Sequence, residues 1–205
     1  MEGEIFMLRT RPISGPMFMP NTKFIMIAIA ILVIFCILYI PVMVRLKKKG
    51  VTITRQLSYL ALFSSIYLIA FATILFVPIV NLFTPLTFKL GSYLNLIPFG
   101  WLREPDVKRQ IIDEVIPNIV LFFPLGISIP VVFREIRKIS KISLVVFLIS
   151  FSIEVFQYFL GRSADVDDII KNTLGGIIGY GFFKVFNRLF NCKVWWNKFN
   201  GNYIC

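Results

Sequence analysis

Long apolar segments without any Asp, Glu, Lys or Arg constrain this chain more than any other feature. Two of them, at residues 24–44 and 57–80, are long enough to cross the hydrocarbon core of a bilayer, which takes about 20 apolar residues in a helix. Three further apolar stretches follow at about residues 115–133, 142–161 and 169–186. Only 16% of the residues are charged, whereas about a quarter are charged in soluble domains. We therefore predict an all-α, polytopic membrane helical bundle with about five transmembrane helices.

The connection over residues 81–114 is long for a link between two helices. Within it, an apolar stretch that begins at Asn95 is broken by Pro98 and Gly100 and is followed by Trp101. Tryptophan is enriched at the headgroup level of membranes. This pattern predicts an interfacial or re-entrant segment between the second and third spans.

The basic residues indicate the partners and the topology. The formal net charge is +11, but Lys and Arg flank the apolar runs, which indicates anchoring to a lipid bilayer and attraction to anionic lipid, with no nucleic acid as a partner. The excess of Lys and Arg falls in the connections at 45–56 and 134–141 and in the C-terminal tail, which alternate and so share one side. Cytoplasmic loops carry such an excess, so we predict the N-terminus outside and the C-terminus in the cytoplasm.

The chain contains no histidine, so acid–base chemistry or metal binding would depend on carboxylates. Glu154 is the most informative of these because it lies inside an apolar stretch. An ionised carboxylate in hydrocarbon costs about 2.5–3.5 kcal/mol on insertion scales. Glu154 should therefore face the bundle interior, be paired or be protonated. Gln157 shares its face of the helix.

The short segment after Gly161 carries Arg162 and the carboxylates of Asp165, Asp167 and Asp168. These carboxylates repel one another unless a cation lies among them. Arg162 is the nearest candidate, and a divalent cation such as Mg²⁺ or Ca²⁺ is another. Alternatively, Asp165 caps the last helix, and the other two aspartates are favourable in its first turn.

Glycines in the last apolar stretch predict a close helix contact. Gly175 and Gly179 form a GxxxG pair, which allows membrane helices to approach one another closely. The contact would bring Asn172 against the fourth stretch, beside Glu154, and Asn118 would join them from the third stretch. This cluster either locks the bundle together through hydrogen bonds or forms a functional site, as ionisable residues inside a membrane often do.

Four blocks of residues occur in a characteristic order. They are Asn95-Leu96-Ile97-Pro98-Phe99, the segment from Asn118 through Pro124 to Gly126, Glu154-x-x-Gln157, and Gly161-Arg162-x-x-Asp165-x-x-Asp168-x-x-x-Asn172-Thr173-x-Gly175-Gly176. Over roughly residues 57–186 the chain resembles the VanZ family of bacterial membrane proteins. The resemblance makes residues 24–44 an additional N-terminal transmembrane helix after a flexible or interfacial tail at residues 1–23. It leaves residues 187–205 as a basic cytoplasmic C-terminal tail.

The founding member of the VanZ family is associated with low-level resistance to the glycopeptide teicoplanin. The resemblance therefore implies reduced susceptibility to teicoplanin-type or lipid-tailed glycopeptides at a bacterial cell membrane. A non-catalytic protein would bind an envelope lipid, a lipid-linked cell-wall precursor or the glycopeptide antibiotic. The candidate binding residues are Asn95, Pro98, Phe99, Asn118, Gln157, Arg162, Asp167, Asn172 and Thr173, and the candidate structural residues are Pro124, Gly126, Gly161, Gly175, Gly176 and Gly179.

The alternative function is a membrane enzyme, a carboxylate-based hydrolase or transferase that modifies an envelope lipid. Glu154 would be its general acid or base, and Asp165 and Asp168 would hold a divalent cation. Arg162 would bind an anionic phosphate group. Transport ranks last, because the polar residues gather at one end of the spans and do not form a path through them.

Overall fold

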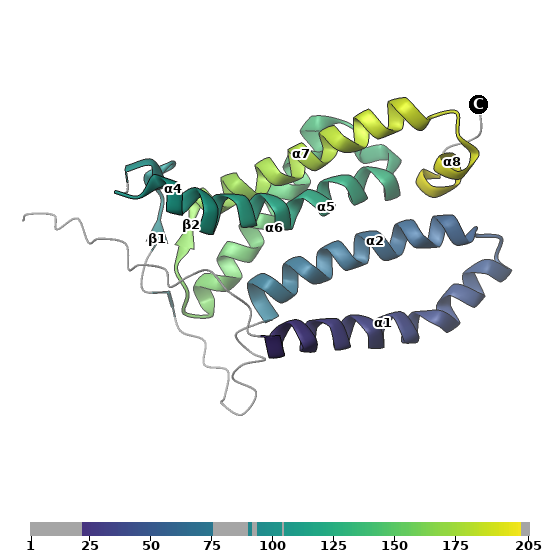
Figure 1. The fold of residues 1–205 in the computed structure, drawn as a ribbon, viewed down its shortest axis with the longest axis horizontal. Helices are drawn as coiled ribbons and strands as arrows, with labels where there is room; N and C mark the ends of the chain where they lie inside the picture. The colour runs from purple at the N-terminus through teal and green to yellow at the C-terminus, as the bar shows by residue number, and fades with distance from the viewer. Residues whose placement is uncertain (1–21, 76–89, 92–93, 104, 202–205) are drawn as a thin grey trace, which may run out of the picture.

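The described part of the chain folds almost entirely into helices that lie side by side (Figure 1). The computed structural model describes residues 22–75, 90–91, 94–103 and 105–201, so nearly all of the predicted tail at residues 1–23 lies outside the described residues. The long helices are α1 (Thr22–Lys48), α2 (Ile53–Ala70), α5 (Ile116–Val132), α6 (Ile139–Phe159) and α7 (Val166–Phe190), and the short ones are α4 (Val107–Gln110) and α8 (Val194–Asn200). Phe71–Leu75 and Ile111–Val115 are π-helical turns, and Gly100–Arg103 and Arg134–Ile136 are 3-10 turns. The strands are β1 (Leu94–Asn95) and β2 (Ala164–Asp165).

Four helical segments among the described residues are long and apolar enough to cross a membrane. They are Ile29–Lys48, Ile53–Ile74, Val107–Val132 and Ile139–Phe159. The 25 residues of α7 would span about 37 Å at the usual rise per residue, but charged residues at both of its ends make it less apolar than these four. The structure thus confirms the all-α membrane bundle, with α7 reaching a spanning length at lower apolarity.

The third span begins earlier than the apolar pattern predicts. Its helix starts at Val107, where the side chain of Asp106 accepts a hydrogen bond from the backbone N–H of Arg109 (3.0 Å), and it continues through a π-helical turn into α5. The predicted start at residue 115 was wrong, because the first turns of this helix carry charged residues. The apolar run therefore begins later than the helix does. Consequently, Glu114 lies on the helix instead of in the preceding connection.

The core lies where α5 packs against α2, α6 and α7, while α1 packs along α2. Phe122 and Leu125 of α5 and Ile142 and Val146 of α6 are fully buried. Large apolar side chains on the outer faces of the helices are exposed, as expected for surfaces that a bilayer covers.

Glycines allow α5 and α7 to approach each other closely. A Cβ atom at Gly175 or Gly179 would collide with the backbone carbonyl of Ile119 or Phe123, both on α5. The GxxxG pair therefore faces the third span, and its predicted contact with the fourth span was wrong. Gly176 makes that contact instead, because it lies against Val146 of α6. Its carbonyl also lies against Gly126 of α5, a few residues after Pro124 inside that helix.

Two arginines tie helix ends together at the end of the bundle where α1 turns into α2. Arg55 donates to the carbonyl of Val132 at the end of α5 (2.7 Å), and Arg137 donates to the carbonyl of Asn200 at the end of α8 (3.0 Å). The last carbonyls of a helix have no hydrogen-bond partner within the helix. An arginine there donates hydrogen bonds to these carbonyls, and its positive charge interacts favourably with the negative end of the helix dipole. The C-terminal segment over residues 187–205 thus includes α8, which packs against α2 and α5.

We expect Gly179→Ala to destabilise the protein by roughly 1–3 kcal/mol, because the added methyl group meets the carbonyl of Phe123. Gly181→Ala on the same helix is the matched control, since a Cβ there meets nothing within 4 Å. Thermal unfolding in detergent should show a lower midpoint for the first variant only. An equal midpoint for both variants would contradict the close α5–α7 contact.

Candidate functional site

A pair of two-residue strands joins the predicted interfacial segment to the start of α7. In this parallel pair Leu94 lies opposite Ala164 and Asn95 opposite Asp165. The side chain of Asn95 is buried, donates to Asp165 Oδ1 (2.9 Å) and accepts from the backbone N–H of Ile97 (3.1 Å). Residues 94–102, called here the apolar loop, are thereby fixed to the segment between α6 and α7 (Figure 1).

Asp167 binds the backbone of the apolar loop. Its side chain is 1% exposed, and its two oxygens accept hydrogen bonds from the backbone N–H groups of Phe99 and Gly100, the second at 3.1 Å. Phe99 has a φ of +59°, in the left-handed region that costs most residues roughly 1–3 kcal/mol. Charge-assisted hydrogen bonds from backbone N–H groups to a buried carboxylate offset this cost. The predicted binding residue Asp167 is thus an anchor for the loop.

Asp165 caps α7, as one of the two sequence interpretations predicted. Its Oδ1 accepts from the backbone N–H of Asp167 at 2.8 Å. Glu154 supports this cap from α6, because its Oε2 accepts from the backbone N–H of Asp165 at 3.0 Å. Glu154 is buried and faces the bundle interior, where the sequence required it to be.

The cation that lies among the carboxylates is Lys171, which the sequence analysis left without a role. Its Nζ lies 3.0 Å from Asp168 Oδ1 and 3.2 Å from Glu114 Oε2, and its side chain is 4% exposed. Asn118 donates to the same oxygen of Asp168 at 3.0 Å. Asp168 and Lys171 are three residues apart on one helix, and this spacing could have predicted their ion pair from the sequence. The sequence gave no sign that Glu114 pairs with Lys171, because the helix was expected to begin after Glu114.

Arg162 lies away from the aspartates for which it was the predicted partner. It is exposed, and its Nη1 donates to the backbone carbonyl of Thr73 at 3.0 Å. Gln157, which is buried, donates to the same carbonyl at 3.1 Å. Thr73 lies in the π-helical turn that ends α2, where carbonyls lack partners within the helix. Gly161 makes the turn between Gln157 and β2 with a φ of +81°, which glycine adopts without strain.

The remaining predicted residues divide between the interior and the surface. Asn172 is buried and donates to the hydroxyl of Ser150 at 2.9 Å, a partner that the sequence analysis missed. Thr173 donates to the carbonyl of Ile169 in its own helix at 2.7 Å, so its hydroxyl serves α7. Pro98 and Phe99 are exposed at the tip of the apolar loop.

This arrangement limits the chemistry of the site. Within the described ranges, no group of three His, Cys, Asp or Glu residues is placed to hold a metal ion. The carboxylates that were expected to bind one accept hydrogen bonds from the fold itself. The network holds the apolar loop at the surface of the protein, where Leu96 is 69%, Ile97 58% and Phe99 52% exposed.

The fold and site define an all-α polytopic membrane protein in which a buried carboxylate network fixes an apolar loop at one end. A model of the VanZ/LLP1 family matches residues 63–187, a range that contains every predicted site residue. The chain belongs to this family. It is also 34% identical over 101 residues to Protein VanZ of Enterococcus faecium, a match that covers 49% of this chain and 58% of that relative. No solved structure matches the chain.

We expect Asp167→Asn to release the apolar loop, because an amide places a donor where one of the two loop N–H groups needs an acceptor. Loss of a charge-assisted hydrogen bond costs about 1.5–3 kcal/mol, which corresponds to roughly 10- to 100-fold faster hydrogen exchange. Exchange should accelerate at Phe99 and Gly100. Asp113→Asn is the control, since Asp113 pairs with Arg109 on the surface. Unchanged exchange in the Asp167 variant would refute the anchoring role.

Proposed function

We propose that this VanZ-family membrane protein lowers susceptibility to teicoplanin-type, lipid-tailed glycopeptides. It does so by binding an amphipathic envelope molecule at its apolar loop. The ligand is an envelope lipid, a lipid-linked cell-wall precursor or the antibiotic itself. The observation that carries the proposal is the anchored loop, whose exposed side chains stand on a backbone held by Asp167.

The loop suits the apolar part of such a ligand. Leu94, Leu96, Ile97, Phe99 and Leu102 are each more than half exposed, and a contiguous exposed apolar surface marks a membrane or ligand contact. Because the loop backbone is fixed by hydrogen bonds, little conformational entropy is lost when a ligand orders against it. A lipid tail or an acyl chain of the antibiotic would pack on these side chains.

Arg162 suits the polar part of the ligand. It is exposed, and among the described residues its one hydrogen-bond acceptor is the carbonyl of Thr73. A guanidinium group has five N–H donors arranged in a plane that matches carboxylate or phosphate oxygens. The strand pair places the segment after Arg162 beside the loop, because Ala164 lies opposite Leu94. The two features together fit a molecule with an apolar chain and an anionic group.

The proposed site faces outward. The basic connections and α8 gather at the opposite end of the bundle, where Arg55 and Arg137 bind helix ends. An excess of Lys and Arg is typical of the cytoplasmic side, so the loop end belongs outside, with the N-terminus outside and the C-terminus in the cytoplasm. Outward placement gives the site access to the outer leaflet and suits an effect at the cell surface.

The second candidate function is a membrane enzyme that modifies a lipid or other envelope substrate. Glu154 favours it, because a buried carboxylate inside a membrane helix is a candidate general acid or base. Against it, Asp165 and Asp168 accept hydrogen bonds from the fold in place of the divalent cation that they would have to hold. Lipid and wall-precursor profiles of cells with and without the protein separate the two functions, since the binding function leaves the profiles unchanged.

We expect Ile97→Ser/Phe99→Ser to remove at least half of any protection against lipid-tailed glycopeptides, because the variant loses the apolar surface of the loop. Protection is measured as the change in minimal inhibitory concentration at equal protein levels. Phe133→Ser, an exposed phenylalanine at the other end of α5, is the matched control and should keep protection. Equal loss in both variants, or full protection in the loop variant, would overturn the assignment.

We expect Ser163→Cys to react with a membrane-impermeant maleimide in intact cells, whereas the native Cys192 stays unlabelled until the cells are opened. Ser163 is exposed beside β2 at the loop end, and Cys192 is exposed between α7 and α8. Cys36→Ala and Cys205→Ala remove the other thiols from the background. The reverse labelling pattern would place the loop in the cytoplasm and refute the outward site.

A further inference from the structure

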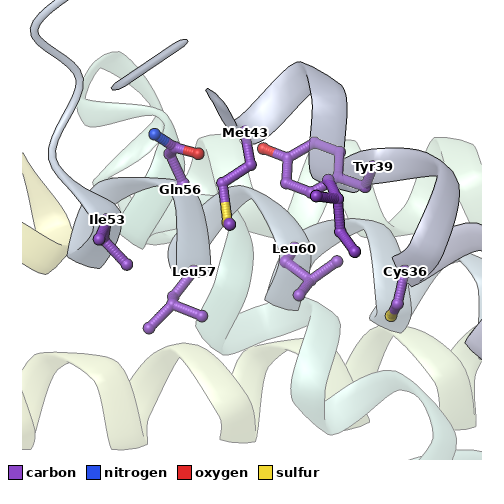
Figure 2. A pocket seen from close by; sticks show the side chains of 8 residues that line it. Cys36, Tyr39, Met43, Ile53, Gln56, Leu57 and Leu60 are labelled. Atoms are coloured by element: carbon purple, nitrogen blue, oxygen red, sulfur yellow. The ribbon is translucent and has the colours of Figure 1, made fainter. Parts of the chain in front are cut away.

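Two adjoining hollows lie at the end of the bundle opposite the apolar loop. The first is an apolar slot of about 90 Å³ between α1 and α2, lined by side chains such as Cys36, Leu57 and Leu60 (Figure 2). The second is a more open hollow of about 400 Å³ around the turn from α1 to α2. Ile53 lines both, so the two hollows adjoin, and together they are called here the groove.

The second hollow is cationic and rich in hydrogen-bonding groups. Lys47 and Lys198 line it from α1 and α8, together with Thr52 and Thr54, whose hydroxyls lie 3.1 Å apart. Thr52 caps α2, so the positive end of that helix dipole points into the same region. In the part of the chain that the structure describes, neither lysine forms an ion pair. An anion placed here would meet positive charge from several directions.

Gln56 adds a hydrogen-bond acceptor, unpaired within the described residues, to the lining of the apolar slot. Its side chain is 1% exposed and lines the apolar slot, with the amide oxygen turned toward Met43 (Figure 2). Its Nε2 donates to the carbonyl of Val51 at 3.1 Å, which fixes the orientation of the amide. Its Oε1 is buried and has no hydrogen-bond partner among the described residues. Buried acceptors are nearly always paired, so this atom indicates a ligand that brings a donor.

These features of the groove together define the ligand. The slot between α1 and α2 is lined mainly by apolar side chains, so it suits an acyl chain. Gln56 lines this slot with an acceptor that has no donor within the described part of the chain, and the cationic hollow adjoins the slot. We infer that the groove binds an anionic lysophospholipid, a lipid with one acyl chain, a free glycerol hydroxyl and a phosphate.

In this complex the single acyl chain enters the slot between α1 and α2. The glycerol hydroxyl, which lies between chain and phosphate, donates to Gln56 Oε1. The phosphate lies between Lys47 and Lys198. A zwitterionic lipid gains less because its ammonium group meets the same lysines, and a second copy of this basic chain would bring like charge to the hollow. The site is separate from the loop end and does not depend on the function proposed there.

Native mass spectrometry of the full chain in detergent tests this site with lipids of one acyl length. We expect lysophosphatidylglycerol to bind about tenfold more tightly than lysophosphatidylcholine, since each lysine near an anionic headgroup contributes on the order of a fewfold. Lys47→Gln/Lys198→Gln should abolish this difference. Lys138→Gln/Lys184→Gln, which removes two exposed lysines elsewhere, should keep it. Equal binding of the two lipids to the unmodified protein, or an equal loss in both variants, would overturn the site.

The hydroxyl contact has its own test. The unmodified protein should prefer lysophosphatidylglycerol over diacyl phosphatidylglycerol, which has the same headgroup and no hydroxyl between chain and phosphate. Gln56→Leu should lose this preference while keeping the preference for anionic over zwitterionic lysolipid. Thermal unfolding of each variant confirms that it is folded. Equal affinity of the unmodified protein for the two phosphatidylglycerol lipids would overturn the lysolipid assignment.

Discussion

The rest of the loop end depends on the carboxylate of Asp167. It accepts the backbone N–H groups of Phe99 and Gly100, which belong to a loop far away along the chain. Without these bonds, the two backbone donors would lose their acceptor, and Phe99 would have no compensation for its left-handed backbone. With them, the backbone is satisfied and the apolar side chains of the loop are left to face outward.

The other acidic residues hold in place the helix start that carries Asp167. Asp165 caps the helix that carries Asp167, and Glu154 binds the backbone N–H of Asp165. Asp168 is neutralised by Lys171, which also pairs with Glu114. All four carboxylates that were predicted as catalytic or binding residues thus have a structural partner. The same end of the molecule supplies the exposed apolar surface on which the proposed binding function rests.

The features predicted from sequence were those set by local spacing. Uninterrupted apolar runs identified the helices, and the position of Asp165 before an apolar stretch predicted its capping role. The link from Asp167 to Phe99 escaped prediction because its donors are backbone groups, which every residue carries. The same reason hid the carbonyl of Thr73, the shared acceptor of Gln157 and Arg162. A strand pair only two residues long leaves no alternating pattern in the sequence.

In the proposed function, the carboxylate network acts by holding the loop and not by transferring protons. Glu154→Gln tests it most directly, because glutamine keeps an oxygen to accept the N–H of Asp165 and removes the ionisable group. The measurement is the inhibitory concentration of lipid-tailed and untailed glycopeptides for cells that express either form at equal levels. We predict that the variant protects as well as the unmodified protein. Complete loss of protection in a folded variant would contradict the account and favour the enzyme.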